Sequence, residues 1–180
     1  MKATGIVRRI DDLGRVVIPK EIRRTMHLRD GDPLEIYTNS DGEVIFRKYS
    51  ALNEMNENAA HVAEVMHKTA GCPVAVFDKD HVVAVSGIPR RELAERRVSR
   101  QLENLMDERS QYFALTGQEH PFLPAEGSER RATGAVPIIT AGDVSGAVVF
   151  LASEHGSTVT ELQKSLITAA AQFLARQIEG

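Results

Sequence analysis

Basic side chains gather at one end of this sequence. Residues 1–29 carry eight lysines and arginines and only three acidic residues, although the whole chain has a formal net charge of −3. A guanidinium group stays charged near neutral pH and can donate paired hydrogen bonds to a phosphate or to the edge of a guanine. The residue types at this end therefore favour contact with a polyanion such as a nucleic acid.

Five arginines are the main candidates for such contacts, and two lysines are auxiliary candidates for phosphate. These residues are Arg8, Arg9, Arg15, Arg23, Arg24, Lys2 and Lys20. A lysine acts on phosphate as a point charge, whereas an arginine offers a planar fork of donors. The alternative is that these side chains are ordinary solvated charges, as most charge runs on protein surfaces are.

Other reactive residue types do not form a catalytic or metal-binding pattern. Cys72 is the only cysteine, so one chain can form neither a disulfide nor a thiolate-rich metal site, and we interpret Cys72 as a small buried residue rather than a redox sensor. His61 and His67 are six residues apart, which places them on different faces of a helix. The sequence has no G-x-S-x-G elbow and no glycine-rich phosphate loop. We therefore expect no enzyme activity, no metal and no cofactor.

Short elements must position the basic residues. The pattern predicts strands over 4–10 and 15–18, a helix over 20–26, and a hairpin with strands over 34–38 and 43–48. About fifty residues of this kind bury too little apolar surface to be stable alone, and no disulfide is available to help. We therefore expect residues 1–50 to form an obligate homodimer.

Longer elements follow and define a second expected domain, residues 51–180. Apolar residues at steps of three and four predict helices over 51–70, 89–107 and 158–179. Valine-rich hairpins are predicted over 74–86 and 132–152, and a long loop with a small strand is predicted over 111–129 between them. Because the hairpins must combine into an antiparallel sheet, the expected fold class is α+β.

The run from Thr4 to Met26 closely resembles the AbrB-type swapped-hairpin DNA-binding domain, through Gly-Arg-Val-Val-Ile-Pro and the arginine-rich helix after it. Over its full length the chain is similar to the stage V sporulation protein T family, in which a GAF domain follows. The resemblance implies a dimeric swapped-hairpin β-barrel and a GAF-like domain with an antiparallel sheet flanked by helices. It also implies that shape and backbone contacts dominate DNA binding.

The same resemblance implies a transcription regulator of sporulation genes, cytoplasmic and nucleoid-associated, acting on double-stranded DNA as an activator or a repressor. Helices 51–70 and 158–179 would pair dimers into a homotetramer. No stretch is apolar for the roughly 20 residues that a membrane span needs. One alternative is an antitoxin-type DNA-binding protein, although the tails of such proteins are usually short and disordered, whereas residues 51–180 are patterned throughout.

The GAF-like domain has two expected roles, which can hold together. It can sense a small uncharged or zwitterionic molecule in a pocket bounded by its sheet and residues 111–130, because long loops in compact domains often cover binding sites. Alternatively, side chains such as Phe77, Leu105 and Phe113 fill that pocket, and the domain only assembles subunits.

Overall fold

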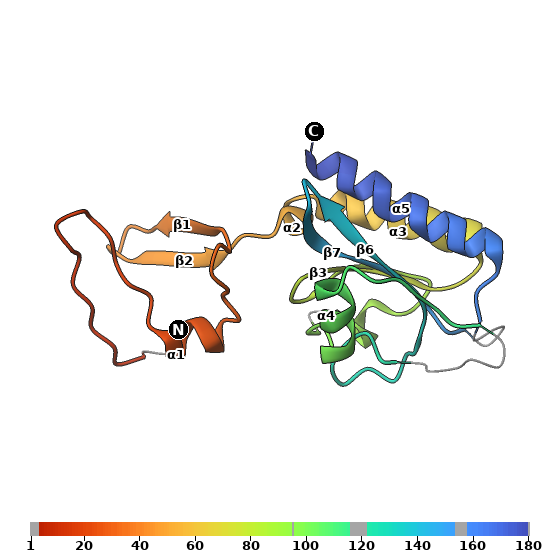
Figure 1. Cartoon of the computed structure of the whole chain (residues 1–180), viewed down its shortest axis with the longest axis horizontal. Helices are drawn as coiled ribbons and strands as arrows, with labels where there is room; N and C mark the ends of the chain where they lie inside the picture. Colours follow the sequence, from red (N-terminus) through yellow and green to blue (C-terminus); the bar gives the residue numbers. More distant parts are fainter. Residues whose placement is uncertain (1–3, 95, 116–121, 154–157, 180) are drawn as a thin grey trace. The chain divides into compact units, whose positions relative to one another are not determined.

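The computed structural model describes residues 4–94, 96–115, 122–153 and 158–179. The chain divides into two compact units, Met1–Tyr49 and Ser50–Gly180. Figure 1 shows the elements of each unit along the chain and labels most of them. None of the described helices has the length and hydropathy of a membrane span.

The first unit contains the helix α1 (Lys20–Thr25) and the hairpin of β1 (Leu34–Thr38) and β2 (Val44–Lys48). The two strands are antiparallel, and Ile36 lies opposite Phe46. In the turn between them, the Oδ1 atom of Asn39 accepts hydrogen bonds from the backbone amides of Asp41 and Glu43. The hairpin expected from the sequence is therefore confirmed.

The strands expected over 4–10 and 15–18 are not formed, because residues 4–19 contain no strand within the single chain. A strand needs a neighbour that pairs with its backbone groups. The only sheet described in this unit is the β1–β2 hairpin, and neither of its strands pairs with residues 4–19. The expectation is thus wrong for the isolated chain, because no pairing partner is present in it.

The second unit is built around one antiparallel sheet. Its strands are β3 (Val74–Asp78), β4 (Val82–Ser86), β5 (Tyr112–Phe113), β6 (Ala132–Thr140) and β7 (Asp143–Leu151). They lie in the order β4-β3-β7-β6-β5. The two predicted hairpins are joined by β3 and β7, which pair with Val76 opposite Val148. This arrangement confirms the α+β class.

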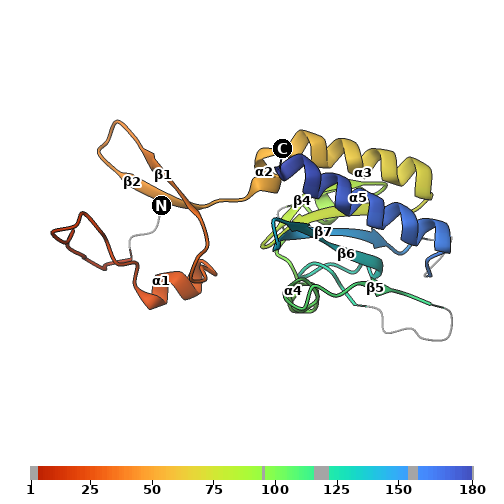
Figure 2. The ribbon, with the colours of Figure 1, turned by 45° about the horizontal axis from the view of Figure 1, so that its top comes forward.

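Helices cover both faces of this sheet. Figure 2 shows α3 (Asn56–Ala70) and α5 (Glu161–Glu179) side by side on one face, and α4 (Arg100–Asp107) on the other. One buried cluster lies under α3 and α5 and includes Val76, Val148 and Ile167. A second cluster includes Phe77, Leu102 and Leu105 on the α4 side. Alternate residues of the central strands thus feed two cores.

Two predicted helices are interrupted. The helix expected over 51–70 is divided into α2 (Ala51–Glu54) and α3, because Met55 has a non-helical backbone with φ −97° and ψ 28°. The helix expected over 89–107 is a 3₁₀ turn at Arg90–Glu92, then an irregular stretch, then α4. Arg97 and Val98 in that stretch form isolated β-bridges to His81 and Ala125. Their backbone is therefore extended and cannot continue a helix.

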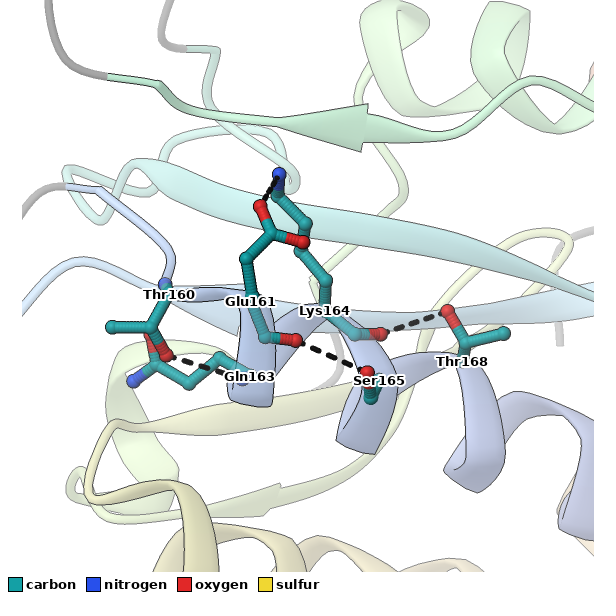
Figure 3. A network of polar contacts seen from close by, with 6 residues as sticks. All are labelled: Thr160, Glu161, Gln163, Lys164, Ser165 and Thr168. Atoms are coloured by element: carbon teal, nitrogen blue, oxygen red, sulfur yellow. Dashed lines mark hydrogen bonds and ion pairs between the residues drawn. The ribbon is translucent and has the colours of Figure 1, made fainter.

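The last helix begins at a capping box rather than at residue 158. The Gln163 amide donates to Oγ1 of Thr160 at 3.2 Å, and the Thr160 amide donates to Oε1 of Gln163 at 2.9 Å. Figure 3 shows this end of α5 together with the Glu161–Lys164 ion pair. The reciprocal bonds satisfy amides that have no partner inside the helix.

Only part of the apolar periodicity of α5 is buried in the core. Its core side is formed by residues such as Ile167, Ala171 and Leu174. Leu162 and Phe173, which the apolar periodicity places on one face, are instead 66% and 52% exposed. The helix therefore carries an apolar stripe in addition to its core face.

Candidate nucleic-acid interface

A tight turn presents the first candidate arginines. The Oδ1 atom of Asp11 accepts hydrogen bonds from the backbone amides of Leu13 and Arg15, and Gly14 adopts a φ of +77° that suits glycine. The Nε atom of Arg15 donates to Oδ2 of Asp11 at 2.8 Å, and its side chain stays 69% exposed. Asp11 therefore fixes the turn and holds the guanidinium of Arg15 through its Nε atom.

The same contacts perturb the carboxyl group. Hydrogen bonds from the backbone amide and then the guanidinium of Arg15 lower the pKa of Asp11. Because the folded pKa is depressed, the stabilising contribution is present above the unfolded value and is lost as the pH falls through the folded pKa. The turn thus keeps its ion pair at neutral pH.

A second carboxylate holds Arg23 on α1. The Nη1 atom of Arg23 donates to Oδ1 of Asp30 at 2.7 Å. The Nε atom of Arg23 is buried and has no hydrogen-bond partner. Arg23 is thus only partly satisfied in the free chain.

The remaining described candidates are exposed at the surface. Arg8, Arg9, Lys20 and Arg24 are exposed, and no ion pair involves them within the described part of the chain. Lys2 lies outside the described residues. The structure therefore brings α1 and the turn into one small unit, with four cations available to an outside partner.

The hairpin adds basic residues that the sequence reasoning missed. The guanidinium of Arg47 lies 4.9 Å from the ring centroid of Tyr37. The Nζ atom of Lys48 lies 3.4 Å from Oδ2 of Asp32 and donates to the carbonyl of His27. The strand register was the signal that could have found the first pair, because Tyr37 and Arg47 are diagonal neighbours across β1 and β2.

The first unit leaves its apolar side chains uncovered. Among residues 4–49, Pro19 is the only buried residue. Large hydrophobic side chains that are at least 58% exposed are Val7, Ile10, Leu13, Val17, Ile36 and Val44. A soluble protein rarely exposes this much apolar surface unless a partner covers it.

The three side chains expected to fill the ligand pocket of the second unit pack in two different clusters. Phe77 and Leu105 belong to the buried cluster on the α4 side of the sheet, and Phe113 packs against the other cluster. An open depression of about 370 Å³ lies beside α5, lined by residues that include Gln111, Phe113 and Lys164. Part of the 111–130 loop, residues 116–121, lies outside the described residues.

Other chemistry is sparse in the described residues. No group of three or more histidine, cysteine or acidic side chains among them could hold a metal ion. Cys72 is buried, and burial raises the pKa of its thiol to about 11. Such a thiol is almost entirely protonated at neutral pH and is a poor nucleophile.

Two family models match the chain. Residues 54–179 match the stage V sporulation protein T C-terminal, transcription factor model. Residues 7–52 match the model of the bacterial antitoxin MazE, described as antidote-toxin recognition. The two matches together span both units.

Comparisons with individual proteins agree with these models. Stage V sporulation protein T of Bacillus subtilis is 42% identical over 179 residues, which cover 99% of each chain. The transition state regulatory protein AbrB of the same organism is 57% identical over 49 residues, or 27% of this chain and 50% of AbrB. The GAF domain of a Coxiella burnetii phosphoenolpyruvate-protein phosphotransferase has a TM-score of 0.56 and 14% identity, covering 69% of this chain and 82% of that one. This last likeness concerns the fold of the second unit.

Proposed function

Because the chain belongs to the stage V sporulation protein T family of transcription factors, we propose that it regulates sporulation genes by binding duplex DNA through residues 1–50. The observation that carries the proposal is the group of exposed cations on one small unit that is AbrB-like in sequence. Phosphate contacts supply most of the affinity in such binding. Residues 54–179 match the transcription factor family, which favours this function over the antitoxin alternative.

The binding unit acts as a homodimer in this proposal. Its apolar side chains, such as Val7 and Val17, are exposed in the single chain. A second copy would cover them and would offer strand partners to residues 4–19, which form no strand in the single chain. Pairing also doubles the number of cations that face one duplex.

The arginines divide into two kinds. Arg8, Arg9 and Arg24, with Lys20, are free to contact phosphates, and Lys2 is assigned the same auxiliary role from the sequence. Arg15 and Arg23 are oriented by Asp11 and Asp30. An oriented guanidinium loses less side-chain entropy when it binds, so we assign these two the more precise contacts with DNA.

A mobility-shift titration of the full-length protein tests the assignment. If one dimer engages about six phosphates, log affinity falls against log salt concentration with a slope near −5. We expect the double variant Arg23→Ala, Arg24→Ala to bind at least tenfold more weakly and with a shallower slope, because each protomer then carries two fewer cations.

The matched control is Lys68→Ala with Arg109→Ala, which removes two exposed cations from the second unit. The control should bind as the unchanged protein does. Equal affinity of the Arg23 and Arg24 variant and the unchanged protein would sink the assignment of residues 1–50 as the DNA contact.

The second unit has an assembly role in this proposal. The apolar stripe of α5, defined as Leu162, Leu166, Ala169 and Phe173, is the surface that would pair dimers into a homotetramer, with α3 beside it. Phe77 and Leu105, two of the side chains expected to fill the effector region, are buried in one cluster, which supports assembly over small-molecule sensing. We assign the protein no catalytic role and place it on the nucleoid in the cytoplasm, where its DNA is.

A further inference from the structure

A second concentration of arginine lies in the unit that does not resemble AbrB. Residues 50–180 contain 12 basic and 17 acidic residues, so this unit is acidic as a whole. Seven of its basic residues fall in 89–100 and 122–131, and all seven are arginine, against four glutamates in the same segments. The excess of positive charge is therefore local.

The fold brings these two segments together. Val98 bridges Ala125, the Glu126 amide donates to the Arg97 carbonyl at 2.9 Å, and the Ser99 amide donates to the Pro124 carbonyl at 2.9 Å. Farther along, the Nε atom of Arg130 lies 2.8 Å from Oε2 of Glu92. Segments far apart in the sequence thus share one surface on the α4 side of the sheet.

Two of the arginines hold this surface in place. Arg130 pairs with Glu92, and its hydrogen bond is the largest of the effects that lower the pKa of that carboxyl. Nη1 of Arg96 donates to the carbonyl of Glu126 at 3.1 Å. It lies so close to Gly127 that a Cβ there would come within 2.6 Å of it. Arg130 and Arg96 therefore have a structural role that needs no ligand.

Four other arginines have no such structural use. Arg90, Arg91, Arg100 and Arg131, which we call the arginine face, are exposed. No ion pair involves them in the described part of the chain, although the charge of Arg91 also helps to lower the pKa of Glu92. Glu126 and Glu129 are the exposed carboxylates described in the two segments. Each guanidinium is therefore available to an acidic partner.

We propose that the arginine face is a second DNA contact, which binds backbone phosphates of the duplex held by residues 1–50. This inference rests on the proposed function. Arginine, unlike lysine, can bind a phosphate with two parallel hydrogen bonds. The chain also tethers this face to a DNA-binding unit, which raises its effective concentration near the duplex.

The surroundings of the face fit phosphate better than a protein partner. Protein interfaces usually contain an apolar or aromatic centre. Leu123, at 39%, is the only exposed large hydrophobic side chain described in these two segments. A charged surface without such a centre suits the nucleic-acid backbone, which is read through electrostatics and not through base edges.

The test uses the full-length protein and a long duplex in the same salt titration. The triple variant Arg90→Ala, Arg91→Ala, Arg131→Ala should bind several-fold more weakly, by a similar factor on unrelated sequences. Its salt slope should be shallower by about one for each phosphate that the variant no longer binds. The Lys68→Ala, Arg109→Ala control should not change either quantity.

Two further measurements keep the test decisive. Arg90→Lys, Arg91→Lys, Arg131→Lys retains the charge and should restore most of the salt slope but less of the affinity. Thermal melting of both triple variants should match the unchanged protein, because the three side chains are exposed. A triple alanine variant that melts normally and binds the long duplex with unchanged affinity and slope overturns the inference and leaves an acidic protein as the partner of this face. If the unchanged protein itself fails to bind DNA, the proposed function falls as well.

Discussion

Carboxylates prepare two of the candidate arginines before any DNA arrives. Asp11 organises its turn and holds Arg15, and Asp30 holds Arg23. These acids reduce the net charge of the unit, yet they cost little affinity if their arginines keep donors free, as the 69% exposed side chain of Arg15 does. The net charge of the unit therefore does not describe the interface fully, because two of its acidic residues orient arginines instead of only cancelling them.

Cys72 gives a prediction at the same scale. With its pKa raised to about 11 by burial, about one thiol in a thousand is ionised at pH 8. We expect alkylation by iodoacetamide to be slow at pH 8 and to accelerate about tenfold for each unit of pH up to about 10, as long as the protein stays folded. Mass spectrometry of time points would measure the rate.

The control for Cys72 is the same protein in concentrated urea, where the thiol should recover the reactivity of an ordinary cysteine. Fast alkylation of the folded protein at pH 7 would instead show an accessible thiolate and would contradict the burial of Cys72 in the cluster under α3 and α5.

At the scale of elements, close packing of strands explains a glycine that the sequence patterns left unassigned. Gly146 lies on β7 between its two neighbours, opposite Asp78 on β3 and Ile138 on β6. A Cβ added there would come within 2.0 Å of the Phe77 carbonyl oxygen and 2.5 Å of Cδ1 of Leu52. Backbone in the centre of a sheet cannot move aside to make room.

We therefore expect Gly146→Ala to destabilise the second unit by about 1–3 kcal/mol or more, the usual range for overpacking a tight core. Chemical denaturation followed by circular dichroism would measure the change. Gly134→Ala on β6 is the matched control, because its added Cβ would meet only side chains, the nearest at 3.4 Å. Similar losses for the two variants would mean that the contact with Phe77 does not decide the stability of this region.

At the scale of the whole molecule, we assign assembly to the apolar stripe of α5, which is exposed at Leu162 and Phe173. Leu162, Leu166, Ala169 and Phe173 follow steps of four, three and four residues, so they form a single line along the helix. The fully buried residues of α5 lie off this line, although Leu166 also packs against the cluster under α3 and α5. The same helix thus packs on the sheet of its own unit and presents an apolar surface to a second copy of the chain.

We expect the full-length protein to sediment as a tetramer at micromolar concentration and the Phe173→Glu variant to sediment as a dimer, because a buried carboxylate without a partner opposes association. Analytical ultracentrifugation would separate the two species. Gln177→Glu, which adds a charge to another exposed position of α5, is the control and should leave the mass unchanged. A Phe173→Glu variant that remains tetrameric would remove α5 from the assembly role.

Several features of this protein could be read from the sequence, because they depend on local order. The cluster of cations in residues 1–29, the hairpins around Asn39 and Ala141, and the α+β class all follow from residue types and short periods. Turn residues and alternating strands act over a few positions, so no distant contact is needed to recognise them. The candidate DNA-binding residues follow from the same local patterns.

Only the tertiary structure decided which surfaces are covered. Periodicity showed that α5 is amphipathic, but the packing of α5 on the sheet decided that Ile167 is buried and Phe173 is exposed. The helix expected over 89–107 was broken because Val98 pairs with Ala125 from a distant segment. The same pairing brings together the two segments that carry the arginine face. Burial depends on which segments meet in space, and that choice is made by the whole core, not by any single window of the sequence.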